Sequence, residues 1–250
     1  MKLKAVLFDT DNTLIFFNET EFFKHYFPRI RKYFSDIIPD EIFQTRILAT
    51  TKTLLDNNGG MSNMKFFMKE FSKGFEDKEN VLKEKFTQFY KNEFHEFKKL
   101  TTTIPGIRNT IETLRKYNLQ LVSASNPIWP EDVQIMRLEW ADIDCRSFGL
   151  ITHIENMHYC KPCVEYYQEI CEMIGVQPEE CLMVGNDPLN DMVPSAIGMK
   201  TYLTTDWIQQ NDSALTISQK IRNEHKEELP KQDFEGPFSG VVEIVKNMIK

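Results

Sequence analysis

The sequence lacks the features of several large classes of protein. It has no surplus of positive charge, since 30 lysines and arginines stand against 37 aspartates and glutamates and give a net charge of −7 at pH 7. Proteins that bind nucleic acids normally present a basic face, so this balance argues against a nucleic-acid partner. No apolar run approaches the length of a membrane span, and residues 1–4 (MKLK) lead straight into a predicted strand. We therefore expect neither a membrane partner nor a signal peptide.

Cysteine is scarce as well. The chain has 5 cysteines in 250 residues, and this small, odd number argues against a disulfide framework. Reduced thiols, and with them a cytoplasmic location, are the simplest interpretation. A chain of this length can bury a full core, either as one large domain or as a core with an insertion. We expect a soluble cytoplasmic globular protein, and the composition does not decide its oligomeric state.

Phenylalanine, by contrast, is abundant and concentrated in one part of the chain. Residues 16–100 hold 15 of the 19 phenylalanines, and their 15 basic and 13 acidic residues give a balance of +2, against −9 for the remainder. The aromatic residues recur every three or four positions, which is typical of amphipathic helices. The pattern is broken at residues 57–60 (NNGG), and Ser62-Asn63 is typical of a helix start. This segment is predicted to form about four helices packed through aromatic side chains.

After Leu100 the sequence alternates between strand-like and helix-like segments. Apolar runs typical of buried strands lie at residues 4–9, 119–124, 149–152, 181–184 and 200–203. Helical periodicity is found at residues 106–114, 166–174, 192–197 and 240–249. This alternation predicts an α/β fold with a doubly wound, Rossmann-like parallel sheet covered by helices on both faces. Residues 206–235 are polar and weakly periodic, and we predict no helix or strand there.

The strand at residues 4–9 is predicted to belong to the same sheet as the strands that follow residue 100, so the helical segment interrupts the sheet domain. We expect residues 1–15 and 101–250 to form the Rossmann-like core and residues 16–100 to form an inserted all-helical domain. No internal repeat or low-complexity tract divides the chain further.

Polar residues follow the ends of the predicted strands. The first strand is followed by Asp9 and Asp11, and later strands by Ser125 and Asn126, by Lys161, and by Asp187 and Asp191. Ligands bind beyond the carboxyl ends of the strands in open α/β sheets, so these side chains are expected to converge. Two neighbouring carboxylates repel each other unless a cation lies beside them, which favours a metal-assisted site with one nucleophile and one proton shuttle. Carboxylates that hold Mg²⁺ and a lysine that neutralises phosphate oxygens suit phosphoryl transfer.

The order and spacing of these residues resemble the four motifs of the haloacid dehalogenase-like hydrolase superfamily. Residues 9–14 (DTDNTL) resemble the first motif, Ser125-Asn126 the second, Lys161-Pro162 the third and residues 185–191 the fourth. The resemblance covers residues 1–15 and about 101–205. The helical segment lies where that family inserts its type-1 cap, so the resemblance implies a phosphatase-type member with a helical cap domain.

The resemblance also implies the catalytic roles. Asp9 would be the nucleophile that forms an aspartyl-phosphate. Asp11 would protonate the leaving group and then activate water. Lys161 would offset the charge on Asp9.

Two sets of binding residues are implied in the same way. The transferred phosphoryl group would be bound by Ser125, Asn126 and Lys161. The cofactor Mg²⁺ would be held by Asp9, the backbone carbonyl of Asp11, Asp187 and Asp191. The substrate would be a small phosphorylated metabolite.

The sequence departs from the family pattern at two positions. Asn12 stands where the family usually has glycine, and because asparagine tolerates left-handed backbone angles the turn is expected to survive. Asn186 stands where many members have an aspartate, whereas the step from Asp187 to Asp191 matches another variant of the family. These motifs leave open which of the three side chains contacts the metal directly. Asp11 favours phosphate esters over halides as substrates, because dehalogenating members lack this second aspartate.

The leading hypothesis is a Mg²⁺-dependent phosphatase. A phosphotransferase or sugar phosphomutase of the same superfamily and a non-catalytic phosphate-binding module are the alternatives. Cys160 and Cys163 form a C-x-x-C pair near His153 and His158, which leaves a redox or zinc-binding function as a further hypothesis. The lysine and proline inside that pair are already explained by the phosphate site, and the chain has no second C-x-x-C. No motif in residues 16–100 names the substrate.

Overall fold

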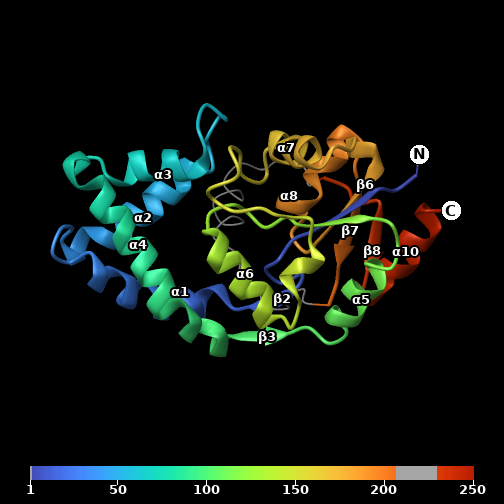
Figure 1. The fold of residues 1–250 in the computed structure, drawn as a ribbon, viewed down its shortest axis with the longest axis horizontal. Coiled ribbons are helices and arrows are strands. Elements are labelled where there is room, and N and C mark those ends of the chain that lie inside the picture. The colour runs from blue at the N-terminus through green and yellow to red at the C-terminus, as the bar shows by residue number, and fades with distance from the viewer. Residues whose placement is uncertain (1, 207–229) are drawn as a thin grey trace.

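The computed structural model describes residues 2–206 and 230–250. It has two parts, a parallel sheet flanked by helices and a group of helices at one end (Figure 1). This group comprises α1 (Glu19–Ile30), α2 (Asp40–Leu54), α3 (Asn63–Phe71) and α4 (Glu79–Glu93), and we call it the helical cap. The first described residues and the carboxyl terminus lie on the side of the sheet away from the cap. No helix in the described part is long and apolar enough to cross a membrane.

The core sheet has six strands in the order β5-β4-β1-β6-β7-β8, and every neighbouring pair is parallel. Its strands are β1 (Ala5–Phe8), β4 (Gln120–Ser123), β5 (Leu150–Ile151), β6 (Cys181–Gly185), β7 (Lys200–Thr204) and β8 (Phe234–Gly236). The five strands predicted from apolar runs are present, and the doubly wound α/β class is confirmed. The sequence did not predict β8, because its three residues lie at the sheet edge, are at most partly buried and contain no apolar run.

The two faces of the sheet bury alternate residues of each central strand. In β1, Val6 and Phe8 belong to one hydrophobic cluster, and Ala5 and Leu7 belong to the other. Helices cover both faces (Figure 1): α5 (Ile107–Leu114), α6 (Glu131–Trp140) and α10 (Val241–Met248) contribute to the first cluster, and α7 (Val164–Ile174) to the second. A strand covered on both sides has no polar face, which explains why the sequence of β1 is continuously apolar.

Aromatic side chains hold the helical cap together, as their spacing predicts. The ring centroid of Phe22 in α1 lies 5.3 Å from that of Tyr26 and 5.0 Å from that of Phe97. Further along the cap, Phe34 lies 4.6 Å from Phe86 of α4. Burying one phenylalanine side chain contributes roughly 1.5–3 kcal/mol, so these rings supply much of the stabilisation of the cap.

The chain passes from the sheet to the cap and back through a small antiparallel ribbon. β2 (Ile15–Phe17) pairs with β3 (Thr101–Thr103). The sequence did not predict these strands, since each has three residues and adjoins a helical segment. The predicted domain limits, which fall close to this ribbon, stay predictions, and residues 207–229 of the predicted core lie outside the described residues.

Two helices differ from the expected pattern. The helix predicted at residues 192–197 is instead the short α8 (Pro188–Asp191) followed by a 3₁₀ turn at Val193–Ile197. Pro194 lacks an N–H group and cannot continue an α-helical hydrogen-bond ladder, which explains the break. The sequence analysis also missed α6, although a proline followed by two acidic residues begins it and is typical of a helix start.

Asn12 adopts the left-handed backbone conformation, with φ at 58°. Its side-chain oxygen accepts a hydrogen bond of 3.0 Å from the backbone N–H of Phe17 in β2. Its own N–H donates to the carbonyl of Ile15 at 2.7 Å. The turn therefore survives the replacement of glycine by asparagine, as predicted, and gains a hydrogen bond that glycine has no side chain to form.

Replacing Asn12 with alanine is expected to lower the free energy of unfolding by about 2–4 kcal/mol, because alanine is strained at a positive φ and leaves the Phe17 N–H without its partner. Asn12→Gly removes the strain but still loses the hydrogen bond, so its cost should be only about 1–2 kcal/mol. Chemical denaturation at pH 7 measures both variants. Equal losses would contradict the importance of the positive φ.

Candidate active site

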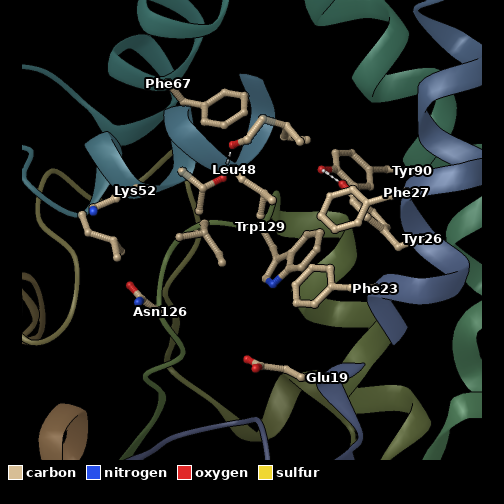
Figure 2. Close-up of a pocket in the computed structure, with 14 residues that line it drawn as sticks. Glu19, Phe23, Tyr26, Phe27, Leu48, Lys52, Phe67, Tyr90, Asn126 and Trp129 are labelled. Carbon is tan, nitrogen blue, oxygen red and sulfur yellow. Dashed lines mark hydrogen bonds between the residues drawn. The ribbon is translucent and has the colours of Figure 1, made fainter. Parts of the chain in front are cut away.

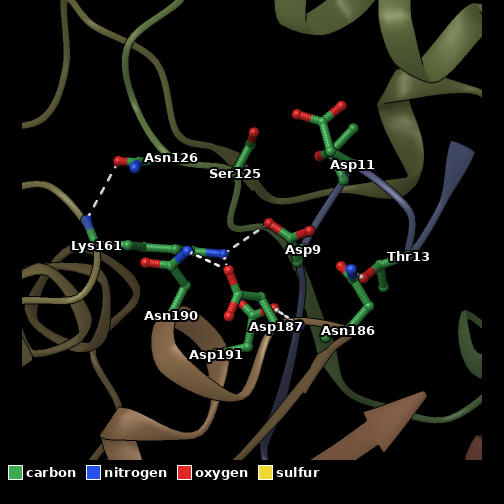
Figure 3. A network of polar contacts seen from close by, with 12 residues as sticks. Asp9, Asp11, Thr13, Ser125, Asn126, Lys161, Asn186, Asp187, Asn190 and Asp191 are labelled. Carbon is green, nitrogen blue, oxygen red and sulfur yellow. Dashed lines mark hydrogen bonds and ion pairs between the residues drawn. The ribbon is translucent and has the colours of Figure 1, made fainter. Parts of the chain in front are cut away.

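The site lies where the strand order of the sheet reverses. β1 is flanked by β4 and β6, and the sheet continues outward to β5 on one side and to β7 on the other. The carboxyl ends of central strands at such a switch point form the usual ligand site of an α/β sheet. Here they open into a cavity of about 110 Å³. The structure brings every predicted site residue to its lining (Figure 3): Asp9, Asp11, Ser125, Asn126, Lys161, Asp187 and Asp191.

The ammonium group of Lys161 joins two carboxylates. Its Nζ donates to Oδ1 of Asp9 and to Oδ1 of Asp191, both at 2.7 Å, and the side chain is 2% exposed. Its backbone N–H donates to Oδ1 of Asn126 at 3.2 Å, and the Lys161–Pro162 peptide bond is cis. Burial alone lowers the pKa of Lys161, but the charges of Asp191 and Asp9 outweigh burial and raise this pKa well above its ordinary value. Lys161 is therefore positively charged at neutral pH.

Asp9 is held at the end of β1 by the neighbouring strand. Its backbone N–H donates to the carbonyl of Val184 in β6 at 2.9 Å. Burial raises the pKa of Asp9 to about 7; Lys161 opposes this rise, whereas Asp191 and Asp11 add to it. One lysine does not compensate for burial together with the acidic groups around Asp9. A further cation in the cavity would favour the ionised carboxylate.

Asp191 packs directly against Gly185, the last residue of β6. A Cβ atom at Gly185 would lie 2.2 Å from Oδ2 of Asp191, so only glycine leaves room for this carboxylate. The same oxygen accepts a hydrogen bond of 3.0 Å from the backbone N–H of Asp187, and the side chain is 1% exposed. Both oxygens of Asp191 are thus occupied, one by Lys161 and one by the loop. Its contacts position the lysine.

The loop between β6 and α8 presents a second acid to the cavity. Asp187 caps α8, because its Oδ1 accepts from the backbone N–H of Leu189 at 2.9 Å and its Oδ2 accepts from the side chain of Asn190 at 2.6 Å. Beside it, Asn186 accepts a hydrogen bond of 3.0 Å from the hydroxyl of Thr13. The residue that departs from the family pattern therefore connects the loop after β6 to the loop after β1.

Ser125 follows β4 and turns its hydroxyl toward the cavity. Its backbone carbonyl accepts from the hydroxyls of Tyr166 and Thr152, each at 2.8 Å, which holds the residue in place. Within the described ranges no group forms a hydrogen bond with the Ser125 hydroxyl. This hydroxyl is therefore available to a ligand oxygen.

Arg137 is a functional candidate that the sequence analysis missed. It lies on α6, is 3% exposed, and its Nη2 forms an ion pair with Oδ1 of Asp11. Its Nη1 donates to the side chain of Gln134 at 2.7 Å. A lone arginine matches none of the motifs, and without α6 in the prediction nothing indicated that it faces the end of β1. The available signal was the helix start at residues 130–132, a proline followed by two acidic residues.

The donor set of the cavity fits a hard divalent cation. Five carboxylates line it, and among them Lys161 pairs with Asp9 and Asp191 while Arg137 pairs with Asp11. Carboxylate and carbonyl oxygens are the ligands that Mg²⁺ prefers. No group of three or more histidine, cysteine or acidic side chains in residues 2–206 and 230–250 is arranged as a preformed metal centre. Lys161 lies between Asp9 and Asp191 and donates a hydrogen bond to one oxygen of each.

The C-x-x-C pair and the nearby histidines each have partners of their own. The Cys160 thiol accepts from Asn63 at 3.5 Å, and the Cys163 thiol donates to Glu165 at 2.5 Å. The histidines pair with glutamates through Nδ1 at 2.7 Å, His153 with Glu155 and His158 with Glu169. Burial raises the pKa of Cys160, which disfavours the thiolate that zinc binding or redox chemistry requires.

Comparison with known proteins identifies the class to which this fold and site belong. A family model for haloacid dehalogenase-like hydrolases matches residues 3–193. The chain therefore belongs to the haloacid dehalogenase-like hydrolase family, as its four motifs predict. It is an enzyme of the hydrolase class.

Individual relatives include phosphatases and a dehalogenase. Pyrophosphatase PpaX of Bacillus cereus (strain AH820) is 26% identical over 203 residues, which cover 80% of this chain and 82% of the relative. The structure of a HAD phosphatase from Thermococcus onnurineus is 18% identical and has a TM-score of 0.56, covering 97% of this chain and 98% of that one. L-2-haloacid dehalogenase from Xanthobacter autotrophicus, with chloropropionic acid covalently bound, is 16% identical and has a TM-score of 0.56, covering 98% and 99%. The two structures show a shared fold.

A double-mutant cycle tests the contact between Lys161 and Asp191. Lys161→Met is expected to lower the free energy of unfolding by about 3–5 kcal/mol, because it leaves two buried carboxylates without their cation. In an Asp191→Asn background the same change should cost at least about 1 kcal/mol less, because only one unpaired carboxylate remains. Urea denaturation of the four proteins gives the coupling energy. A coupling near zero would show that this contact does not stabilise the fold.

Proposed function

We propose that this hydrolase is a Mg²⁺-dependent phosphatase that acts on a small phosphorylated metabolite through an aspartyl-phosphate on Asp9. The observation that carries the proposal is that two carboxylates, Asp9 and Asp11, lie in one cavity and each contacts a different buried cation. Asp9 contacts a buried lysine, and Asp11, two residues later, contacts a buried arginine. The relative named pyrophosphatase PpaX supports chemistry on phosphate compounds.

In the first step, an oxygen of Asp9 attacks the phosphorus atom and the bond to the leaving oxygen breaks. Oδ1 of Asp9 accepts from Lys161, so Oδ2 is the attacking atom. The Ser125 hydroxyl and the amide nitrogen of Asn126 donate to the phosphoryl oxygens, because the amide oxygen of Asn126 is already used by Lys161. Asp11 transfers its proton to the leaving oxygen, which departs as a neutral alcohol.

In the second step, water attacks the phosphorus atom of the aspartyl-phosphate. Asp11 takes a proton from this water, the bond from phosphorus to Asp9 breaks, and inorganic phosphate leaves. Arg137 contacts Oδ1 of Asp11 and holds this carboxyl group in place at the end of β1. Arg137 thus orients Asp11 for both proton transfers.

The metal site in this proposal consists of Asp9, the backbone carbonyl of Asp11, Asp187 and Asp191. Asp191 also holds Lys161 and the backbone of Asp187. When bound, Mg²⁺ would act as a Lewis acid on the phosphoryl oxygens and reduce the repulsion among the carboxylates.

Asp9→Asn is expected to reduce phosphatase activity by on the order of 10³-fold or more, because an amide is not a nucleophile. Chelation by EDTA should abolish the activity of the unaltered protein, and added Mg²⁺ should restore it. The measurement is release of phosphate from a panel of phosphate esters by purified protein. Asp77→Asn, a change at an exposed cap position, is the matched control and should retain full activity.

Product analysis separates this proposal from its alternatives. Free phosphate formed in water indicates a hydrolase, whereas an isomerised sugar phosphate indicates a phosphomutase. Full Mg²⁺-dependent activity of pure Asp9→Asn protein would overturn the assignment of the nucleophile. No turnover of any ester would favour the non-catalytic phosphate-binding module.

Arg137→Met is expected to lower kcat by on the order of 10- to 100-fold, because Asp11 loses the contact that orients it. Arg137→Lys keeps the charge and should recover part of the loss. In Asp11→Asn protein the change Arg137→Met should have no further effect, since there is no carboxylate left to position. Steady-state kinetics of these variants, with thermal unfolding as the check on folding, measure the effect. Additive losses would mean that Arg137 acts independently of Asp11.

A further inference from the structure

A second cavity, of about 130 Å³, adjoins the catalytic cavity between the cap and the loop that follows β4. The two cavities share three lining residues, Glu19, Asn126 and Ile128. Figure 2 shows Asn126 and Glu19 at one end of the second cavity and Phe67 at the other. A molecule whose phosphate lies beside Asp9 would therefore extend into this second cavity.

The walls of the second cavity are predominantly apolar. Phe23 and Phe27 come from α1, Leu48 from α2, Phe67 from α3, and Trp129 from the loop after β4. These side chains surround the space from several sides in Figure 2. Cap and core together thus form an enclosure that favours a hydrophobic group.

Most polar groups of this lining are paired or lie at one end. The hydroxyls of Tyr26 and Tyr90 bond to each other at 3.1 Å, and burial raises the pKa of Tyr26, so this phenol stays neutral. The charged lining residues are Glu19 and Lys52, and Figure 2 shows them on the same side as Asn126. The remaining phenolic O–H of this pair and the indole N–H of Trp129 can each donate one hydrogen bond, so a charge or several hydroxyls placed at the aromatic end would lose most of their hydrogen bonds to water.

We propose that the second cavity receives the leaving group of the substrate, and that this leaving group carries a single aromatic or alicyclic ring without hydroxyls or charges. The inference rests on the proposed phosphatase function. The volume agrees with it, because a cavity of about 150 Å³ lined by Leu, Ile and Phe side chains is known to hold one benzene molecule. The substrate class is therefore a phosphomonoester of a small hydrophobic alcohol.

The same walls disfavour two other kinds of phosphate compound. A sugar phosphate would place several hydroxyl groups against Phe67 and Trp129, where their partners in water are lost. Inorganic pyrophosphate would place a second phosphate in a space whose lining has one lysine and one glutamate. The hydroxyls would find few partners there, and the charge of Lys52 is offset by that of Glu19.

The test compares three compounds with the unaltered protein and Mg²⁺. Benzyl phosphate and glucose 6-phosphate both release a primary alcohol, so their intrinsic reactivities are similar, and pyrophosphate is the third. We expect kcat/KM for benzyl phosphate to exceed that for each of the others by at least about tenfold. Equal values, or a preference for glucose 6-phosphate or pyrophosphate, would overturn the inference while leaving the phosphatase function intact.

Two matched variants on the same helix locate the effect. Leu48 and Ile42 both lie on α2 and are 37% and 43% exposed, but only Leu48 lines the second cavity. Leu48→Asn should lower kcat/KM for benzyl phosphate by about tenfold, because it places an amide in the apolar wall. Ile42→Asn makes the same chemical change outside the cavity and should alter nothing. Equal effects of the two variants would count against the cavity as the binding site.

Binding provides a readout that does not need turnover. 2-Phenylethylphosphonate has the shape of benzyl phosphate but a carbon in place of the bridging oxygen, so it is not hydrolysed. Calorimetry should show binding to the unaltered protein and to Ile42→Asn, and binding about tenfold weaker to Leu48→Asn. If no ester is hydrolysed, the phosphatase function fails, and this measurement still decides the cavity. Absence of phosphonate binding to the unaltered protein would overturn the inference.

Discussion

The contact of one buried ammonium group with two buried carboxylates is the interaction on which the site depends. Lys161 joins the end of β1, through Asp9, to α8, through Asp191. Each of these charges alone would be unfavourable in the interior by several kcal/mol, and together they compensate one another. Gly185 lets Asp191 approach the sheet, and the backbone N–H of Asp9 is bonded to β6. The backbone therefore holds both carboxylates at the positions where Lys161 can contact them. The arrangement of charges and the fold therefore stabilise each other.

The core lines the catalytic cavity mainly with polar side chains, and the cap lines the adjoining second cavity mainly with apolar ones. The core places carboxylates, a lysine, an arginine and a hydroxyl around the strand ends. The cap adds aromatic side chains that pack its own helices together. A few of them also line the second cavity. In the proposed function, the polar space would hold a phosphate and the apolar space the remainder of the substrate. Substrate specificity would then depend on both parts together.

Much of the fold and of the site could be predicted from the sequence, for identifiable reasons. Strands buried on both faces have uninterrupted apolar runs, and the motifs at their ends mark Asp9, Lys161 and the acids after β6. The edge strand β8 was not predicted, because a partly exposed strand of three residues has neither an apolar run nor an alternating pattern. Arg137 was not predicted as a site residue, because its partner Asp11 is 126 residues away in the sequence and only the packing of α6 brings the two together.

The β2–β3 ribbon has a mechanical consequence. The chain crosses between sheet and cap twice, and the two crossings are hydrogen-bonded to each other. A rotation of the cap would have to bend both strands together and break the backbone hydrogen bonds that Asn63 and Met64 of α3 donate to the core loop after β5. Phe17, at the cap end of β2, is bonded to Asn12 and lines the catalytic cavity. The ribbon thus begins within the loop that carries Asp9, so a displacement of the cap at the ribbon would also displace one wall of the catalytic cavity.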